Sequence, residues 1–196
     1  RSEMCIRDSL NTGAMYRAAT LYFLEHSLNE DSSTEEISKA LNNIKIDFKD
    51  NEIFLNDINV ENEIRTDIVT KNVSWFSAIA LVRERLVDMQ REIAKEKSFV
   101  LDGRDIGTVV FPNAKYKFYL TANARQRAIR RFEQKESKLT VEEIEQAIIS
   151  RDQYDSTREI SPLKKAEDAI EIDNSNLNID QTIDLILKNM EKSDVL

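Results

Sequence analysis

Phe99-Val100-Leu101-Asp102-Gly103-Arg104-Asp105 is the stretch of this sequence that decides the fold. It begins as a short, continuous apolar run and ends in an acid and a glycine. This pattern is typical of a strand buried on both faces of a parallel sheet. Two further strands of this kind are predicted at 116–120 and 169–172, with helices between them. Strands that alternate with helices predict an α/β domain with a parallel sheet.

The spacing of apolar residues predicts the other elements. Between 44 and 60 the period changes to two, which predicts a small antiparallel hairpin with a third short strand. A capping box of Ser33 and Glu36 predicts a helix start, and a long helix is expected from Val73 to the charged residues 95–97. The remaining helices are predicted at 14–26, at 122–134, from 140 to about 154, and in the last segment, where Ile179, Ile183, Ile186 and Met190 share one face.

The composition of the 196 residues excludes several classes of protein. The 28 Lys and Arg against 36 Asp and Glu give a net charge of −8, which argues against a surface that binds nucleic acid or anionic membranes. No apolar run approaches the roughly 18 residues of a membrane span, and no leader sequence is evident. The single cysteine, Cys5, excludes an internal disulfide framework and a thiolate metal cluster. We therefore expect a single cytoplasmic domain.

The first nine residues, Arg1 to Ser9, show neither helical nor strand periodicity. Read back into codons, Ser2 to Ser9 is similar to a translated adapter of the kind used in DNA sequencing libraries. We therefore expect residues 1–9 to be a non-native scar and the domain to cover 10–196.

Two predicted turns place an arginine beside a glycine. The first is Asn11-Thr12-Gly13, followed by Arg17, and the second is the stretch 102–105. In an open parallel sheet, ligands bind beyond the carboxyl ends of the strands. Arginine is the preferred partner of phosphate, because its planar fork donates two parallel hydrogen bonds. For any single arginine a solvated surface charge is the usual explanation, but two such turns at one sheet edge make an anion site an equal alternative.

Four arginines lie within seven residues of one predicted helix, with no acid before Glu133. Because like charges this close repel one another, we expect something anionic to compensate them when the site is occupied. The four are Arg125, Arg127, Arg130 and Arg131.

Arg151, Asp155 and Arg158 follow at i, i+4 and i+7, as one stripe of a helix or its end. One interpretation is an intrahelical ion pair worth about 0.2–0.5 kcal/mol. The other is a ligand-facing stripe whose carboxylate accepts hydrogen bonds from ribose hydroxyls.

Together these motifs resemble the bacterial cytidylate kinases, of the nucleoside-monophosphate kinase group. The resemblance runs from about Leu10 to near the C-terminus and rests on TGAMYR at 12–17, EIRT at 63–66, DGRDIGTVVFP at 102–112 and the stretch 151–158. It implies a P-loop NTPase-like parallel sheet with flanking helices and a small antiparallel insert. The nucleoside-monophosphate-binding insert would span about 39–75 and the lid about 123–158.

The resemblance also implies the reaction, transfer of the γ-phosphoryl group of ATP to CMP or dCMP with Mg²⁺. Phosphoryl transfer needs positioning and charge stabilisation, which explains an arginine-rich site without a protein nucleophile. Matched by motif, the implied substrate-binding residues are Arg17 and Arg104 on the CMP phosphate, Ser74, Arg83 and Arg158 on the cytosine edge, Arg151 and Asp155 on the ribose, and Thr12.

Further roles are implied for residues close to the reacting phosphates. Asp105 is a plausible acceptor for the cytosine amine, and Asp102 would hold Mg²⁺ through water. Arg127, Arg130 and Arg131 resemble the arginines of the lid, which would close over ATP and exclude water. With Arg104 and Asp105, the implied catalytic residues are therefore Arg127, Arg130 and Arg131.

The sequence departs from this family in its glycines. The family has a glycine-rich phosphate-binding loop after its first strand, but Gly13, Gly103 and Gly107 form no G-x-x-x-x-G-K run. Asn11 stands where the family usually has Asp. We therefore expect the first central strand and its loop to be missing. Each unpaired buried group on the strands beside it costs about 1–3 kcal/mol, against a typical total stability of about 5–15 kcal/mol. An unfolded or aggregating chain without ATP turnover is the expected result.

Two other functions stay open at this point. The chain could be a CMP-binding module without catalysis, which keeps the acceptor site and lacks the donor site. It could also be a kinase of another small acceptor, such as shikimate or another nucleotide. In each case we expect a monomer that binds neither nucleic acid nor membranes. The sequence does not separate CMP, dCMP and UMP.

Overall fold

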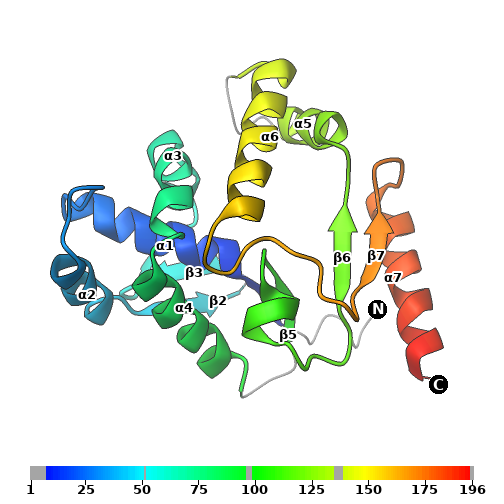
Figure 1. Ribbon diagram of the computed structural model, residues 1–196, viewed down its shortest axis with the longest axis horizontal. Helices are drawn as coiled ribbons and strands as arrows, with labels where there is room; N and C mark the ends of the chain where they lie inside the picture. Colours follow the sequence, from blue (N-terminus) through cyan, green and yellow to red (C-terminus); the bar gives the residue numbers. More distant parts are fainter. Residues whose placement is uncertain (1–7, 51, 96–98, 135–138, 195–196) are drawn as a thin grey trace. The chain divides into compact units, whose positions relative to one another are not determined.

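The structure is a computed structural model that describes residues 8–50, 52–95, 99–134 and 139–194 (Figure 1). The chain forms two compact units. Unit 1 comprises the residues up to Ile106 together with Arg158–Ile160, and unit 2 comprises Gly107–Thr157 and Ser161–Leu196.

Strands and helices alternate in both units, which confirms the α/β class. In unit 1 the elements are β1 (Asp8–Asn11), α1 (Thr12–Glu25), α2 (Thr34–Asn42), β2 (Ile46–Lys49), β3 (Glu52–Leu55), β4 (Ile58–Asn59), the 3₁₀ turn η2 (Glu63–Arg65), α3 (Asp67–Phe76), α4 (Ala80–Ile93) and β5 (Phe99–Asp102). The π-helical turn η3 (Ile106–Val110) begins at the last residue of this unit's first segment. In unit 2 the elements are β6 (Phe118–Thr121), α5 (Ala124–Glu133), α6 (Val141–Thr157), β7 (Ile170–Asp173) and α7 (Ile179–Asp194).

Strands β1 and β5 are parallel neighbours and end side by side, with Asn11 opposite Asp102. Both glycine turns predicted from the sequence therefore lie at one sheet edge. The hydroxyl of Thr12 donates to the Asp102 carbonyl at 2.7 Å. The side chain of Asn11 caps α1 by accepting from the backbone N–H of Ala14 at 2.9 Å. The two turns are thus joined by a direct hydrogen bond.

Strand β1 begins at Asp8, so two residues that the sequence analysis left outside the domain take part in the sheet. Strand pairing uses the backbone N–H and C=O groups. Every residue other than proline supplies both, so no apolar side-chain pattern is needed for pairing. Residues 1–7, which complete the expected scar, lie outside the described residues.

The predicted antiparallel hairpin and its third strand are confirmed. Strands β2 and β3 pair with Ile46 opposite Leu55, and β4 pairs with β3. The link between β3 and β4 is a two-residue turn in which Asn56 and Asp57 have φ values of 49° and 65°. Positive φ at both positions is the geometry of a type I′ turn, which Asn and Asp tolerate better than most residues.

The single long helix predicted from Val73 is wrong, because two helices occupy this stretch. Helix α3 ends at Phe76 and α4 begins at Ala80, and Ile79 between them is extended, with ψ of 122°. The Arg83 guanidinium donates to the carbonyl of Ser77 at 3.1 Å. A side-chain donor therefore satisfies a carbonyl at the end of α3, where the helical hydrogen-bond ladder stops.

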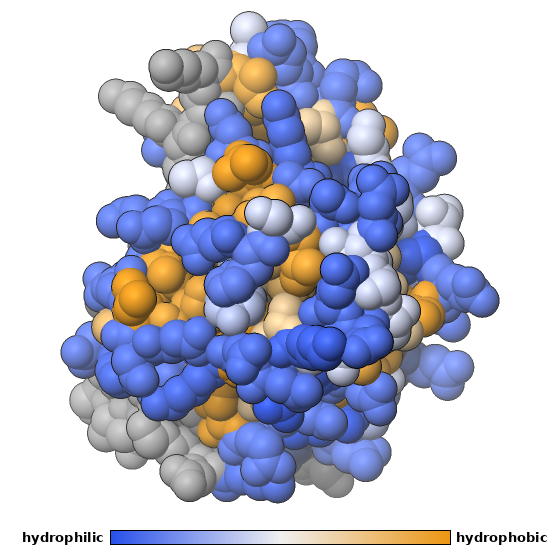
Figure 2. All heavy atoms as spheres, turned by 90° about the vertical axis from the view of Figure 1, so that its left-hand side faces the viewer, coloured by the Kyte–Doolittle hydropathy of each residue, from blue (hydrophilic) through white to orange (hydrophobic). Residues whose placement is uncertain are grey.

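The core of unit 1 joins α1, the three-stranded insert and α4 into one cluster. Helix α1 contributes Met15, Ala18 and Phe23, and α4 contributes Val82 and Leu86. The face of the molecule on the side of α2 and α3 is mostly hydrophilic, with apolar side chains gathered in a few places (Figure 2). These apolar residues of α1 and α4 thus pack inward, as the helical period predicts.

Unit 2 is built on the parallel pair β6 and β7, with Phe118 opposite Ile170 (Figure 1). Helices α5 and α6 pack against each other. Strand β6 begins two residues later than predicted. On α7, Ile179 and Ile183 are exposed, so the shared apolar face of this helix is not fully buried.

The prediction that the strands at 99–101 and 116–120 are buried on both faces is wrong for two of their residues. Val100 in β5 is 56 % exposed and Leu120 in β6 is 51 % exposed. Within the described ranges each of these strands has one hydrogen-bonded neighbour, β1 and β7 respectively. A strand with a single neighbour leaves one edge and part of its apolar surface open. Unit 1 nevertheless has a buried core, and the expected unfolded or aggregating chain stays a prediction, which the urea experiments below test.

Among the described residues, no helix is both long enough and apolar enough to span a membrane.

Gly103 is expected to be intolerant of any side chain. A Cβ at this position would lie 2.3 Å from the Thr12 hydroxyl and 2.9 Å from the Ile106 side chain. Gly103→Ala should therefore lower the free energy of unfolding by about 1–3 kcal/mol. Gly107→Ala is the control, because there the nearest atom is Cδ of the flexible Lys117 side chain, at 3.0 Å. Urea unfolding measures both variants, and an equal loss in the two would contradict the account.

Candidate active site

Arg17 projects from α1 towards η2 and α3 in unit 1. Its Nη1 donates to the Ile64 carbonyl at 3.1 Å and to the Thr70 hydroxyl at 2.9 Å. These two elements thus hold the guanidinium that was predicted to bind a phosphate. Since Arg17 is six residues after Asn11, it lies on the helix that starts at the joined glycine turns.

Arg83 and Asp105 form a buried ion pair in unit 1. Nη2 of Arg83 donates to the Asp105 carboxylate, and their side chains are only 4 % and 5 % exposed. Arg83 comes from α4 and Asp105 from the turn after β5, so the pair joins two elements of the unit. Ser74, which was also matched to the cytosine edge, lies two residues before the end of α3, and its carbonyl accepts from the Ser77 hydroxyl at 2.9 Å.

Tyr16 lies against this ion pair. The Arg83 Cζ atom is 5.2 Å from the centre of the Tyr16 ring, within cation–π range. Burial raises the pKa of the Tyr16 phenol to about 12, although the Arg83 charge and a contact with the Gln90 amide act in the opposite direction. Asp105 and Arg158 also act on this hydroxyl electrostatically. The Tyr16 phenol therefore stays protonated at neutral pH.

Tyr16 and Gln90 were given no role by the sequence analysis. The signal for Gln90 was present, because it occupies a position on α4 where the helical period predicts an apolar residue. Tyr16 lies inside a motif that was recognised, but its neighbour Arg17 received the assignment.

Asp102 and Arg104 lie at the carboxyl end of β5, where both are exposed. Partial loss of water around the Asp102 carboxyl raises its pKa, and the nearby Arg104 charge partly offsets this shift. Within the described ranges no three His, Cys, Asp or Glu side chains gather as a metal site. A single carboxylate still fits Mg²⁺, since this ion is commonly bound by one or two carboxylates together with substrate phosphates.

The four clustered arginines of the predicted lid lie on α5 in unit 2, and three of them contact groups of the same unit. Arg125 donates to Glu142 at 2.9 Å and to Glu145 at 3.1 Å. Arg127 pairs with Asp152. These carboxylates on α6 supply much of the compensation that the sequence analysis assigned to a bound anion.

Arg130 makes a different kind of contact. Its Nη2 donates to the carbonyls of Asn174 at 2.6 Å and Leu177 at 3.0 Å, in the link between β7 and α7. Arg131 makes no such hydrogen bond with any residue that the structure describes, and it is half-buried. Arg130 therefore connects α5 to the sheet of unit 2, whereas Arg131 keeps its hydrogen-bonding capacity.

The expected stripe of Arg151, Asp155 and Arg158 is divided. Arg151 and Asp155 lie on α6, with Nε of Arg151 3.8 Å from the buried Asp155 carboxylate. Helix α6 ends at Thr157, so Arg158 lies beyond it and belongs to unit 1. The i, i+4, i+7 stripe therefore reaches the end of the helix, with its last member one residue beyond α6.

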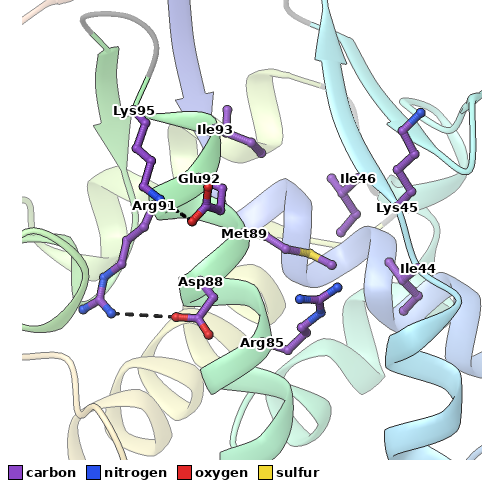
Figure 3. Close-up of a pocket in the computed structure, with 10 residues that line it drawn as sticks. All are labelled: Ile44, Lys45, Ile46, Arg85, Asp88, Met89, Arg91, Glu92, Ile93 and Lys95. Atoms are coloured by element: carbon purple, nitrogen blue, oxygen red, sulfur yellow. Dashed lines mark hydrogen bonds and ion pairs between the residues drawn. The ribbon is translucent and has the colours of Figure 1, made fainter.

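The cavity drawn in Figure 3 is not lined by any of the predicted site residues described above. It has a volume of about 700 Å³ and is lined by residues of α4 and of the start of the insert, among them Ile46, Arg85 and Met89. Dashed lines in Figure 3 mark ion pairs between Arg91 and Asp88, at 3.9 Å, and between Lys95 and Glu92, at 2.5 Å.

Comparison with known proteins gives a consistent picture. The family model described as cytidylate kinase matches residues 4–192. A protein named cytidylate kinase from Fusobacterium nucleatum is 48 % identical over 186 residues, which cover 93 % of this chain and 85 % of that protein. Proteins of the same name from Thermotoga neapolitana and Streptococcus sanguinis are 42 % and 45 % identical, and the matches cover 94 % and 93 % of this chain and 86 % and 84 % of those proteins.

The Arg83–Asp105 pair should be intolerant of losing one partner. Asp105→Asn leaves the Arg83 charge buried without compensation, so the free energy of unfolding should fall by about 3–5 kcal/mol. Glu61→Gln breaks the exposed ion pair with Arg65 and should cost no more than about 1 kcal/mol. Replacing both buried partners, as Arg83→Met with Asp105→Leu, should recover part of the loss. Urea midpoints test this, and equal losses for Asp105→Asn and Glu61→Gln would refute it.

Arg130 and Arg131 should differ in their effect on unit 2. Arg130→Met removes donors from the carbonyls of Asn174 and Leu177, so the free energy of unfolding should fall by about 1–3 kcal/mol. Arg131→Met, one residue along the same helix, should change it by less than about 0.5 kcal/mol. Amide hydrogen exchange in the β7–α7 link measures the difference. Faster exchange in the Arg131 variant than in the Arg130 variant would be inconsistent with these contacts.

Proposed function

This chain belongs to the cytidylate kinase family, and we propose that its unit 1 binds the acceptor, CMP or dCMP, for phosphoryl transfer from ATP. The proposal rests on one observation above all, the buried Arg83–Asp105 pair. Phosphoryl transfer needs a protein that positions the reactants and stabilises negative charge. The acceptor phosphate oxygen is itself the nucleophile, so no nucleophilic side chain is needed.

Arg17 and Arg104 are proposed to hold the acceptor phosphate. Arg17 is fixed by the Ile64 carbonyl and Thr70 hydroxyl, so its side chain is ordered before a ligand arrives. Arg104 follows the strand end at which Thr12 and Asp102 are joined. An ordered arginine loses less entropy when it binds a phosphate, which supports this assignment.

The cytosine edge is proposed to meet Arg83 and Asp105. Cytosine carries an amine donor next to a ring-nitrogen acceptor and a carbonyl acceptor. A guanidinium and a carboxylate side by side offer the complementary donors and acceptor, and uracil reverses two of these three groups. Ser74 and Arg158 complete the proposed base-reading set. A mismatched base leaves buried polar groups unpaired, which makes discrimination strong.

Residues of unit 2 are proposed for the sugar and the transferred phosphate. We assign Arg151 and Asp155 to the ribose hydroxyls, and the region from about 123 to 158 to the lid. In the lid, Arg127, Arg130 and Arg131 are the proposed catalytic arginines, together with Arg104 and Asp105. Arg131 is the best supported of the lid residues, because contacts inside unit 2 already engage Arg127 and Arg130.

Asp102 is the residue proposed to hold Mg²⁺, through water. The ion would neutralise charge on the phosphates of ATP. Thr12 lies beside Asp102, with its hydroxyl on the Asp102 carbonyl, and is proposed to line the substrate site.

A second function is favoured by the glycine pattern. The 196 residues contain no G-x-x-x-x-G-K run, which in P-loop kinases cradles the phosphates of ATP. We therefore propose that this chain binds CMP but turns over ATP weakly or not at all. Our expectations of a scar at 1–9, a missing first strand, a cytoplasmic monomer, and no binding to nucleic acid or membranes stay predictions.

Binding of CMP tests the acceptor proposal directly. Isothermal titration of the chain should show CMP binding that Arg104→Ala weakens about 10- to 100-fold, because a charge-assisted hydrogen bond to phosphate is worth about 1.5–3 kcal/mol. Binding of cytidine, which lacks the phosphate, should change little. Arg85→Ala, in the cavity of Figure 3, is the matched control and should leave CMP binding unchanged. Equal effects of the two variants would contradict the assignment.

Coupled assay of ADP formation separates the kinase from the binding module. With saturating CMP, ATP and Mg²⁺, we expect no ADP formation above the rate without CMP, although CMP binds. CMP-dependent turnover by this chain would show that the glycine-rich run is dispensable and would overturn the second proposal.

A further inference from the structure

Gln90 is a fully buried polar residue that the proposed site does not use. It lies on α4 and is 1 % exposed, among the apolar side chains of Leu86 and Val87. It follows Arg83 by seven residues, so the two side chains project from the same face of the helix, two turns apart. An apolar residue at this position would fit the core without the cost of burying an amide.

The Gln90 amide keeps unfilled hydrogen-bonding capacity. Neither its nitrogen nor its oxygen makes a hydrogen bond of ordinary geometry with any residue that the structure describes. The same holds for the Tyr16 hydroxyl and for Nε of Arg83. Because an unmet buried polar group destabilises the folded state, three residues of this kind need an explanation beyond packing.

These groups form a series that leads from Gln90 through Tyr16 to Arg83. The Gln90 amide comes from α4, which packs on α1, and it is close enough to the Tyr16 hydroxyl to act on the pKa of this phenol. The Tyr16 ring faces the Arg83 guanidinium, whose Cζ is 5.2 Å from the ring centre. Arg83 in turn pairs with Asp105 and donates to the Ser77 carbonyl. The Arg83 guanidinium, which donates to two acceptors and lies over one aromatic ring, therefore has little freedom to tilt.

We infer that Gln90 is a positioning residue for base selectivity, which fixes the Tyr16 ring and through it the tilt of the Arg83 guanidinium. This inference rests on the proposed function of Arg83 and Asp105. Gln90 touches neither the base nor the reacting phosphate in this assignment. It acts by keeping Arg83 in the one orientation that donates to the acceptors of cytosine.

Selectivity is the property that this arrangement controls. A guanidinium held at a fixed angle presents its donors to the ring nitrogen and carbonyl of cytosine, and meets an opposing donor on uracil. A guanidinium free to tilt accommodates both bases, at a small loss for cytosine and a gain for uracil. Loss of Gln90 should therefore reduce the ratio of the two affinities more than either affinity alone.

The test measures dissociation constants for CMP and UMP on the full chain by isothermal titration. Gln90→Leu should reduce the preference for CMP about tenfold, and Tyr16→Phe should reduce it in the same direction. If Gln90 acts through Tyr16, the two effects should not add. The double variant should then keep the same CMP preference, within about twofold, as the single variant with the lower preference. Leu86→Met is the control, since it changes the same buried face of α4 without a polar group, and should keep the ratio.

The ratio is insensitive to stability, because a partly unfolded population weakens both affinities equally. If Gln90→Leu does not fold, Tyr16→Phe, which removes one hydroxyl, carries the test alone. An unchanged ratio in Gln90→Leu or Tyr16→Phe, or independent losses that multiply in the double variant, would overturn this inference and leave the proposed function standing. A wild-type chain that binds CMP and UMP equally, or neither, would overturn the proposed function and this inference with it.

Discussion

The burial of a guanidinium and a carboxylate against each other is the constraint on which unit 1 depends. Arg83 and Asp105 are almost completely removed from water, and a buried ion pair recovers its desolvation cost only when its geometry and hydrogen bonds are good. Here the Ser77 carbonyl and the Tyr16 ring complete the surroundings of Arg83. Since apolar residues would fill this space at lower cost, stability alone does not account for the pair. Recognition of a base with matching donors and acceptors is the role that we propose for it.

The pair also depends on the strand ends beside it. Asp105 is delivered by the turn after β5, and this turn is fixed by the parallel pairing of β1 and β5 and by the hydrogen bond from Thr12 to the Asp102 carbonyl. Gly103 permits this close approach. The sheet edge, the glycine turn and the buried pair are thus connected by direct contacts, so we expect a change in any of them to affect Arg83 and Asp105.

The sequence predicted those parts of the fold that local patterns control. The two-residue period at 44–60 predicted the three-stranded insert, and Ser33 with Glu36 forms the predicted capping box. The break between α3 and α4 was missed, because it depends on a side chain from the next helix that binds the Ser77 carbonyl. The exposure of Val100 and Leu120 was missed as well, since an apolar run does not reveal how many neighbours a strand has.

The candidate site shows the same division. Motifs predicted that Arg83 and Asp105 serve one site, but spacing along the chain could not show that they pair with each other, 22 residues apart. The role of Gln90 depends on α1 packing against α4, and the compensation of Arg125 and Arg127 depends on α6. Such contacts between elements arise only in the folded chain.

Nuclear magnetic resonance of the Arg83 guanidinium tests the central claim most directly. The account predicts that saturating CMP shifts the Nε and Cζ signals of Arg83 strongly, and that cytidine does so as well. UMP should shift them much less at equal occupancy. Arg83 signals that stay in place when CMP is bound would contradict the claim that this buried pair recognises the base.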